Sequence, residues 1–118
     1  MVTFELPYDV VQLRYYLADD GHSPFEHWFT GLDAAAAAKV SVALARLEQG
    51  NISNAKRVGE EVLEYRIDWG PGYRVYFGRD GDVLVILLTG GTKKRQQHDI
   101  KMAKGMWEDY RRRRPKAR

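Results

Sequence analysis

The fold is constrained most by three consecutive segments with the residue pattern of β-strands, separated by strong turn signals. The segments are residues 62–69, 73–77 and 83–89, and the turns between them are Gly70-Pro71-Gly72 and Asp80-Gly81. In the first segment Leu63, Tyr65 and Ile67 alternate with charged residues, which is the period of a strand with one buried face. The third segment is apolar on both faces, as in a strand that is covered on both sides. The sequence therefore predicts three antiparallel strands joined by hairpins.

One further strand and two helices are predicted before this sheet. Residues 10–17 alternate and are rich in β-branched and aromatic side chains, so we expect a strand there. Ser23, followed by Pro24 and then by Glu26, is typical of a helix start. A second helix is expected over residues 34–49. The side chains expected to face the core are Phe25, Trp28, Phe29 and Leu32 in the first helix and Ala37, Val40, Leu44 and Leu47 in the second.

The end of the chain predicts a long helix from Thr92 to about Arg113, and its buried stripe should be Ile100, Ala103, Trp107 and Tyr110. The polar residues 51–61 are expected to form an irregular loop. The element order is then β-α-α-β-β-β-α. Helices grouped around a mainly antiparallel sheet define an α+β domain, and the chain length of 118 residues fits a single domain over residues 1–118.

Several function classes are disfavoured by residue usage. The chain has no Cys, and the spacing of its three His residues matches no common metal motif, so we expect neither a metal nor a cofactor. The longest apolar run, residues 83–88, is far shorter than the ~20 residues that cross a bilayer. The N-terminus does not have the pattern of a signal peptide. We therefore expect a cytoplasmic protein.

Charge is distributed unevenly along the chain. The net charge is only +3, but residues 93–118 hold eleven Lys or Arg against three acids, a local charge of +8. Such asymmetry indicates a polyanionic partner for the C-terminal part. The basic tail at about 111–118 has a second interpretation, as a solvated segment that only aids solubility.

Cations also gather on the predicted hairpin. If the Gly-Pro-Gly turn pairs Trp69 with Tyr73, then Arg66 lies opposite Tyr76, and Arg74 shares their face. That face would be exposed sheet, because the opposite one must pack on the helices. The alternative is that both arginines form solvated ion pairs, worth ~0 to 1 kcal/mol each. Their acidic partners would be Asp68 for Arg74 and Glu64 or Glu61 for Arg66.

A second group of cations, Lys93, Lys94 and Arg95, falls in the first turn of the predicted last helix. The helix dipole disfavours cations there, whereas the free backbone N–H groups of a helix start favour a phosphate. The group therefore indicates an anion site, unless it consists of exposed residues whose cost is screened by salt. Lys56 and Arg57, in the loop before the second strand, are candidates for a further wall of this anion site.

Cations without metal ligands or a nucleophilic triad suit cleavage of RNA by its own 2′-hydroxyl. The protein then needs only to bend the strand, stabilise the charged phosphorane and move protons. His98, the His nearest to the cluster, is a candidate acid or base, or else a solvated residue of the helix surface. Tyr76 is a candidate for stacking on a splayed base.

Three stretches resemble the RelE/ParE superfamily, in particular its HigB-like addiction module killer protein branch. They are Leu63-Glu64-Tyr65-Arg66-Ile67-Asp68-Trp69-Gly70-Pro71-Gly72-Tyr73-Arg74-Val75-Tyr76-Phe77, Leu87-Leu88-Thr89-Gly90-Gly91-Thr92-Lys93-Lys94 and Gln96-Gln97-His98-Asp99-Ile100. The resemblance implies a RelE-like fold, neutralisation by a cognate antitoxin, expected to be of the helix-turn-helix type, and cleavage of mRNA in the ribosomal A site.

The same resemblance assigns catalytic roles to Arg66, Arg74, Lys93, Lys94 and His98. It assigns RNA binding to Lys56 and Arg57, and the residue analysis adds Tyr76 and Arg95. RelE itself has a Tyr near its C-terminus for proton transfer. In this chain the equivalent position is His98 or Asp99, depending on the register.

Two other functions remain open from sequence. A ParE-like toxin would share the fold but act by poisoning DNA gyrase, with no catalytic cluster. A non-catalytic RNA-binding module would use the same charges without the chemistry.

Overall fold

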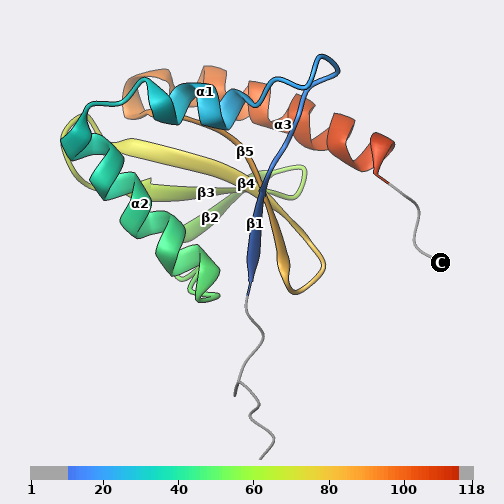
Figure 1. Cartoon of the computed structure of the whole chain (residues 1–118), viewed down its shortest axis with the longest axis horizontal. Helices are drawn as coiled ribbons and strands as arrows, with labels where there is room; N and C mark the ends of the chain where they lie inside the picture. The colour runs from blue at the N-terminus through green and yellow to red at the C-terminus, as the bar shows by residue number, and fades with distance from the viewer. Residues whose placement is uncertain (1–10, 115–118) are drawn as a thin grey trace, which may run out of the picture.

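The computed structural model describes residues 11–114, which form a five-stranded sheet with three α-helices (Figure 1). The strands are β1 (Gln12–Tyr15), β2 (Ala55–Gly59), β3 (Val62–Ile67), β4 (Tyr73–Asp80) and β5 (Leu84–Thr92). The helices are α1 (Pro24–Thr30), α2 (Ala34–Glu48) and α3 (Gln96–Arg113), and a 3-10 turn (Lys93–Arg95) precedes α3. The predicted α+β class is confirmed. No helix in residues 11–114 has the length and apolar character needed to cross a membrane.

The sheet has the strand order β1-β5-β4-β3-β2, with β1 parallel to β5 and the other neighbours antiparallel. The predicted meander of three strands is therefore confirmed. Strand β2 was not expected, because residues 51–61 show little apolar alternation. As an edge strand it pairs on one side only, and edge strands commonly carry charged side chains. Its turn to β3 has positive φ angles at Gly59, Glu60 and Glu61.

The predicted pairing of Trp69 with Tyr73 is wrong, because the strands close two residues earlier, at Ile67 and Tyr73. Trp69 belongs to the turn, where its N–H donates to the carbonyl of Ile67 at 2.9 Å. Arg66 therefore lies opposite Arg74 rather than opposite Tyr76. A shift of this kind moves each partner by two positions, so every side chain keeps its face of the sheet.

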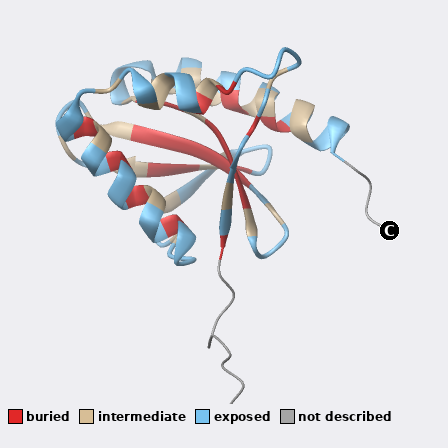
Figure 2. Cartoon of the chain, viewed as in Figure 1, coloured by how far each residue is buried: buried red, intermediate tan, exposed pale blue. Residues whose placement is uncertain are grey.

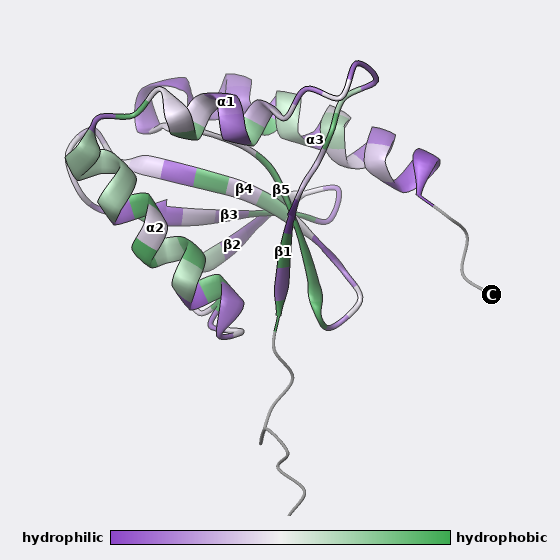
Figure 3. Ribbon diagram, in the orientation of Figure 1, coloured by the Kyte–Doolittle hydropathy of each residue, from purple (hydrophilic) through white to green (hydrophobic). Residues whose placement is uncertain are grey.

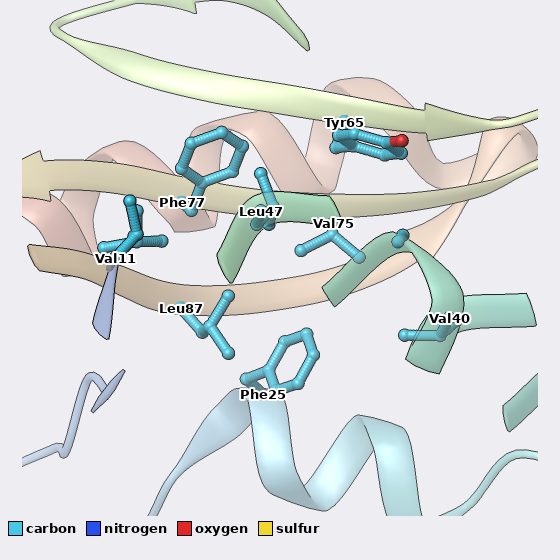
Figure 4. Packing of buried hydrophobic residues seen from close by; sticks show 10 residues of the cluster. Val11, Phe25, Val40, Leu47, Tyr65, Val75, Phe77 and Leu87 are labelled. Carbon is cyan, nitrogen blue, oxygen red and sulfur yellow. The ribbon is translucent and has the colours of Figure 1, made fainter. Parts of the chain in front are cut away.

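Two hydrophobic cores lie on opposite faces of the sheet. Figure 2 shows the central strands as largely buried. Helices α1 and α2 cover the first face, where Phe25, Val40 and Leu47 pack against Val75, Phe77 and Leu87 (Figure 4). Helix α3 covers the second face with Ala103 and Trp107, which pack with Ile86 and Leu88 of β5. Strand β5 is thus covered on both sides, as predicted.

The predicted buried faces of α2 and α3 are correct, but not every residue predicted on them is fully buried. In α2 the fully buried residues are Ala36, Val40, Ala43 and Leu47, so Ala37 and Leu44 lie at the margin of the stripe. In α3 Ala103 and Trp107 are buried, whereas Ile100 and Tyr110 are half-buried. The close approach of α3 depends on Gly78, because a Cβ there would collide with the indole ring of Trp107.

Ion pairs at the C-terminal end of α3 join Arg111 and Arg114 to acids outside the helix, and Arg112 and Arg113 to Asp109 within it. They join Arg111 to Glu61 at 2.9 Å, Arg112 to Asp109 at 2.8 Å, Arg113 to Asp109 at 2.5 Å and Arg114 to Asp80 at 2.7 Å. The hydroxyl of Tyr16 also donates to Asp109, and that of Tyr110 to Asp80. The four arginines are exposed as well as paired, so the alternatives of a solvated segment and of a segment with a polyanionic partner both stay predictions. Residues 115–118 lie outside the described part of the chain.

Candidate active site

The strand register places the candidate site on the face of the sheet that α3 covers. Directly opposed residues in a ladder share a face, so Lys56, Glu64, Tyr76 and Thr89 form one row across four strands. The next row contains Arg66, Arg74 and Gly91. Two arginines and a tyrosine thus surround one carboxylate at the level where α3 begins.

The centre of this cluster is the carboxylate of Glu64, which is 0% exposed. One oxygen accepts from Arg66 Nε at 2.8 Å and from Arg74 at 3.3 Å. The other accepts from the Tyr76 hydroxyl and from Gln96 Nε2, both at 2.9 Å. Four donors come close to saturating the lone pairs of a carboxylate, so a buried charge is well compensated here.

Burial raises the pKa of Glu64, but the hydrogen bonds from Arg66, Gln96 and Tyr76 and the charge of Arg74 outweigh it, so that the pKa lies below its usual value. Burial and the neighbouring carboxylate both raise the pKa of Tyr76 above its usual value. Glu64 is therefore ionised at neutral pH, and Tyr76 keeps its proton. Neither group is free to exchange protons with a substrate.

The expectation that this face is open sheet is wrong. Tyr76 is 0% exposed and Arg74 is 6% exposed, because the start of α3 lies over them. The ring of Tyr76 has no free face for a base to stack on. The side chain of Arg66 is 39% exposed, so within this group it alone can meet a large ligand.

Helix α3 can pack closely against β5 because β5 has a glycine, Gly91, where the helix begins. A Cβ at Gly91 would collide with the carboxylate of Asp99, which occupies that space. The Asp99 Oδ2 atom is buried and has no hydrogen-bond partner among residues 11–114. Burial raises the pKa of Asp99, against the lowering effect of Arg95 and His98.

Lys93, Lys94 and Arg95 form the 3-10 turn immediately before Gln96, and not the first turn of an α-helix as predicted. All three are exposed, and none forms an ion pair with an acid in residues 11–114. The Lys93 N–H donates to the Gly72 carbonyl at 2.8 Å, which fixes the turn against the β3–β4 loop. No side chain caps the start of α3. The turn therefore presents three cations beside uncapped N–H groups, close to the Glu64 cluster.

Other predicted residues are separated from this cluster. Arg95 and His98 line a groove of about 580 Å³ between α1 and α3, together with His22 and His27. Arg57 pairs with Leu63 and so belongs to the opposite face of the sheet from Lys56. The ladders thus place Lys56, Arg66 and Arg74 on one face of the sheet, whereas Arg57 lies on the opposite face and His98 lines a groove on the flank of α3. No three His, Asp or Glu side chains within residues 11–114 gather as a metal site requires.

The sequence indicated Glu64 only as one of two possible partners of Arg66 in a solvated ion pair. The pair is present but its carboxylate is buried, and Gln96 was not predicted as a member of the site. Glu64 and Arg66 are two residues apart in a strand, so their side chains lie on the same face of the sheet. The strand pattern therefore predicts that Glu64 lies beside the arginines. Gln96 lies four residues before Ile100 and seven before Ala103, so it extends the buried stripe of α3. Polar residues on a buried face must form hydrogen bonds with one another, and this requirement would have linked Glu64 and Gln96 to the arginines.

A sheet of this order, with two helices on one face and one helix over a buried polar cluster on the other, defines a small RelE-like domain. The chain belongs to the family described as phage derived protein Gp49-like, whose model matches residues 27–108. This is a RelE/ParE-type toxin-like family, associated with the toxins of toxin–antitoxin systems. An uncharacterized protein of Haemophilus influenzae is 46% identical over 81 residues, which are 68% of this chain and 82% of that protein. Residues 27–108, which the family model matches, include the Glu64 cluster and the cations at the start of α3, but not residues 111–114.

Proposed function

We propose that this protein is a HigB-like toxin of a toxin–antitoxin pair, which cleaves mRNA on the ribosome and so inhibits translation. The observation that carries the proposal is the pairing of half-exposed Arg66 with the buried, ionised Glu64, next to three exposed cations at the start of α3. An arginine held by a buried carboxylate is oriented before the substrate arrives. Such preorganisation is what stabilisation of a charged transition state requires.

In the proposed reaction, the RNA 2′-hydroxyl attacks the adjacent phosphorus, the bond from phosphorus to the 5′-oxygen breaks, and a 2′,3′-cyclic phosphate and a 5′-hydroxyl result. Arg66, Lys93 and Lys94 stabilise the added charge on the phosphorane. Arg74, which is buried against Glu64, acts as a positioning residue. Each such preorganised donor is worth ~10²- to 10³-fold in rate.

Protons move from the 2′-hydroxyl and to the 5′-oxygen, and we assign this transfer to His98, with Asp99 beside it. His98 is exposed and lines the groove between α1 and α3 together with Arg95, the last residue of the 3-10 turn. Lys56 and Arg95 extend the binding surface on either side. Tyr76 and Arg57 take no part, because one is buried and the other lies on the opposite face.

The expected partners are mRNA, the ribosome and a cognate antitoxin of the helix-turn-helix type. Because the candidate surface is cationic, an acidic segment of the antitoxin would neutralise it and exclude RNA. The complex should then weaken as salt is raised, since its rim contacts are exposed.

A second candidate, a ParE-like toxin that poisons DNA gyrase, is favoured by the burial of Arg74 and Tyr76. A protein that acts only by binding needs no reactive groups, and a saturated carboxylate is compatible with a purely structural role. A non-catalytic RNA-binding module is compatible with the same burial.

The test is mRNA cleavage with and without ribosomes, alongside a gyrase supercoiling assay. Wild-type protein should cut mRNA only on ribosomes, and Arg66→Ala with Lys94→Ala should abolish the cuts. The pair leaves buried Arg74 in place, so Glu64 keeps its bonds from Arg74, Tyr76 and Gln96 when the half-exposed Arg66 is removed. Arg79→Ala, which removes another exposed cation, is the control and should cut normally. Gyrase inhibition without cleavage would support the ParE-like function, and RNA binding alone would support the third.

A further inference from the structure

A groove of about 630 Å³ lies between α2 and the strands β2 and β3. Its lining includes four cations, Lys39, Arg46, Lys56 and Arg66, and one acid, Asp68. Lys39, Arg46 and Lys56 are exposed and pair with no acid in the described range 11–114. The groove is therefore a second concentration of positive charge, apart from the turn before α3.

The groove follows an open edge of the sheet. The β2–β3 ladder ends where Ala55 pairs with Tyr65, so Arg66 and Ile67 have no strand partner on their outer side in the described ladder. Arg66 thus reaches both regions: it lines the groove, and it donates to Glu64 on the α3 side. A ligand in the groove would continue around this edge to the proposed reaction centre.

The sequence of α2 arranges its two cations along the groove. Lys39 and Arg46 are seven residues apart, which is two helical turns, or about 10 Å along the axis. The Lys39 ammonium lies 5.7 Å from the centre of the Trp69 ring, a cation–π contact that fixes its position at one end. A row of spaced cations suits a chain of phosphates better than it suits a single anion.

We propose that this groove binds the single-stranded RNA that flanks the scissile phosphate, with Lys39, Arg46 and Lys56 on its phosphates. The proposal rests on the proposed function and adds the path of the substrate to it. RNA is favoured over an acidic peptide because the groove runs into Arg66, the residue that joins it to the reacting group.

The experiment measures binding of a short single-stranded 2′-O-methyl RNA, which lacks the nucleophile and stays intact, over a series of salt concentrations. The variant is Lys39→Ala with Arg46→Ala. Both residues are exposed on α2, and Ala is the best helix former, so the helix should persist. We expect about a tenfold loss of affinity. The slope of log affinity against log salt should become less steep by about 1.4, because each lost phosphate contact on a single strand removes ~0.7.

The matched control is Arg14→Ala with Arg79→Ala, which removes two exposed cations outside the groove. It should bind with unchanged affinity and slope. Wild-type slope in the Lys39 and Arg46 variant would overturn the groove as an RNA path. If that variant binds RNA normally but loses an acidic antitoxin segment, the groove is a protein-docking surface and the proposal is wrong.

The two proposals fail in different ways. If the wild type binds RNA through the groove but never cuts mRNA on ribosomes, the proposed function falls and the groove remains an RNA-binding site. If the wild type cuts and the groove variant keeps normal affinity and salt slope, the groove proposal falls alone.

Discussion

The two ends of α3 carry similar charge but in different surroundings. At the start, Lys93, Lys94 and Arg95 are exposed and meet no acid in the part of the chain that the structure describes. At the end, all four arginines of residues 111–114 are in ion pairs. Both ends are hydrophilic, and Figure 3 shows the last turns as one of the most hydrophilic parts of the molecule. The partners of the cations, and not their number, distinguish a candidate site from a structural clamp.

The helix dipole makes the same distinction. Cations near a helix C-terminus stabilise it by ~0.3 to 1 kcal/mol each, and cations near the N-terminus oppose it by a similar amount. The arginines at 111–114 are therefore explained by stability alone. The cations at 93–95 are not, which is the physical reason for assigning them to a ligand.

The largest expected effect separates the two glutamates that pair with arginine. Glu64→Gln should lower the free energy of unfolding by about 3 to 5 kcal/mol, because it leaves the charge of buried Arg74 without its partner. Glu61→Gln removes the exposed partner of Arg111 and should cost at most about 1 kcal/mol. Urea unfolding of both variants measures this. Equal losses would mean that the Glu64 cluster does not hold the site together.

The next effect is on activity. Lys93→Ala with Lys94→Ala should reduce mRNA cleavage ~10²-fold or more while leaving the free energy of unfolding unchanged or slightly raised. Arg111→Ala with Arg112→Ala, the same change at the other end of α3, should leave the cleavage rate within about twofold. Cleavage rates on ribosome-bound mRNA, with unfolding curves for each variant, provide the measurement. A larger loss of activity from the C-terminal pair would reverse the comparison.

A smaller effect on the free energy of unfolding is expected when the pH is lowered. The folded pKa of Glu64 is lowered, so its stabilising effect is complete above its unfolded pKa and is lost as pH falls through the folded value. Asp109 behaves alike, since hydrogen bonds from Arg113 and Tyr16 lower its pKa to about 2. Asp99, with a raised pKa, acts in the opposite direction by favouring the protonated folded state. We expect net loss of stability from about pH 5 towards pH 2, measured by urea midpoints, and a shallower loss in Glu64→Gln.

The smallest effect is expected at the exposed pair of Arg111 and Glu61. Arg111→Ala should change the melting temperature by no more than a few degrees, in line with exposed ion pairs. High salt should erase the difference from wild type. A difference that persists in high salt would show that Arg111 acts by packing rather than by charge.

The strands with alternating side chains and the capped helices were predictable because their signals are local. Residues 62–89 gave a three-stranded meander, and Ser23 and Asp33 accept from the N–H groups of Glu26 and Ala36 as helix caps do. Strand β2 was not predictable in this way, since an edge strand of five residues has no apolar face of its own. The hairpin register failed because two residues were assigned to strands instead of to the loop.

The cations of the candidate site were predicted, whereas Glu64 was predicted only as a possible solvated partner of Arg66 and not as the buried carboxylate that holds both arginines. Arg66 and Arg74 were placed on the correct face by alternation alone. The burial of that face could not be predicted from the neighbouring sequence, because it depends on the position of α3. Two strands, β4 and β5, separate α3 from β3 in the chain. The partner that organises both arginines, Glu64, is defined only after that contact with Gln96 has formed.

The most direct test of the central claim, that cations at the start of α3 and Arg66 act on an RNA phosphate, is the chemistry of the cut ends. Ribosome-bound mRNA should be treated with wild-type protein and with Arg66→Ala and Lys94→Ala together, and the fragment ends identified. We expect 2′,3′-cyclic phosphate and 5′-hydroxyl ends with the wild type and no cuts with the double variant. Growth arrest by the wild type without any cleaved mRNA, or equal cleavage by the double variant, would contradict it.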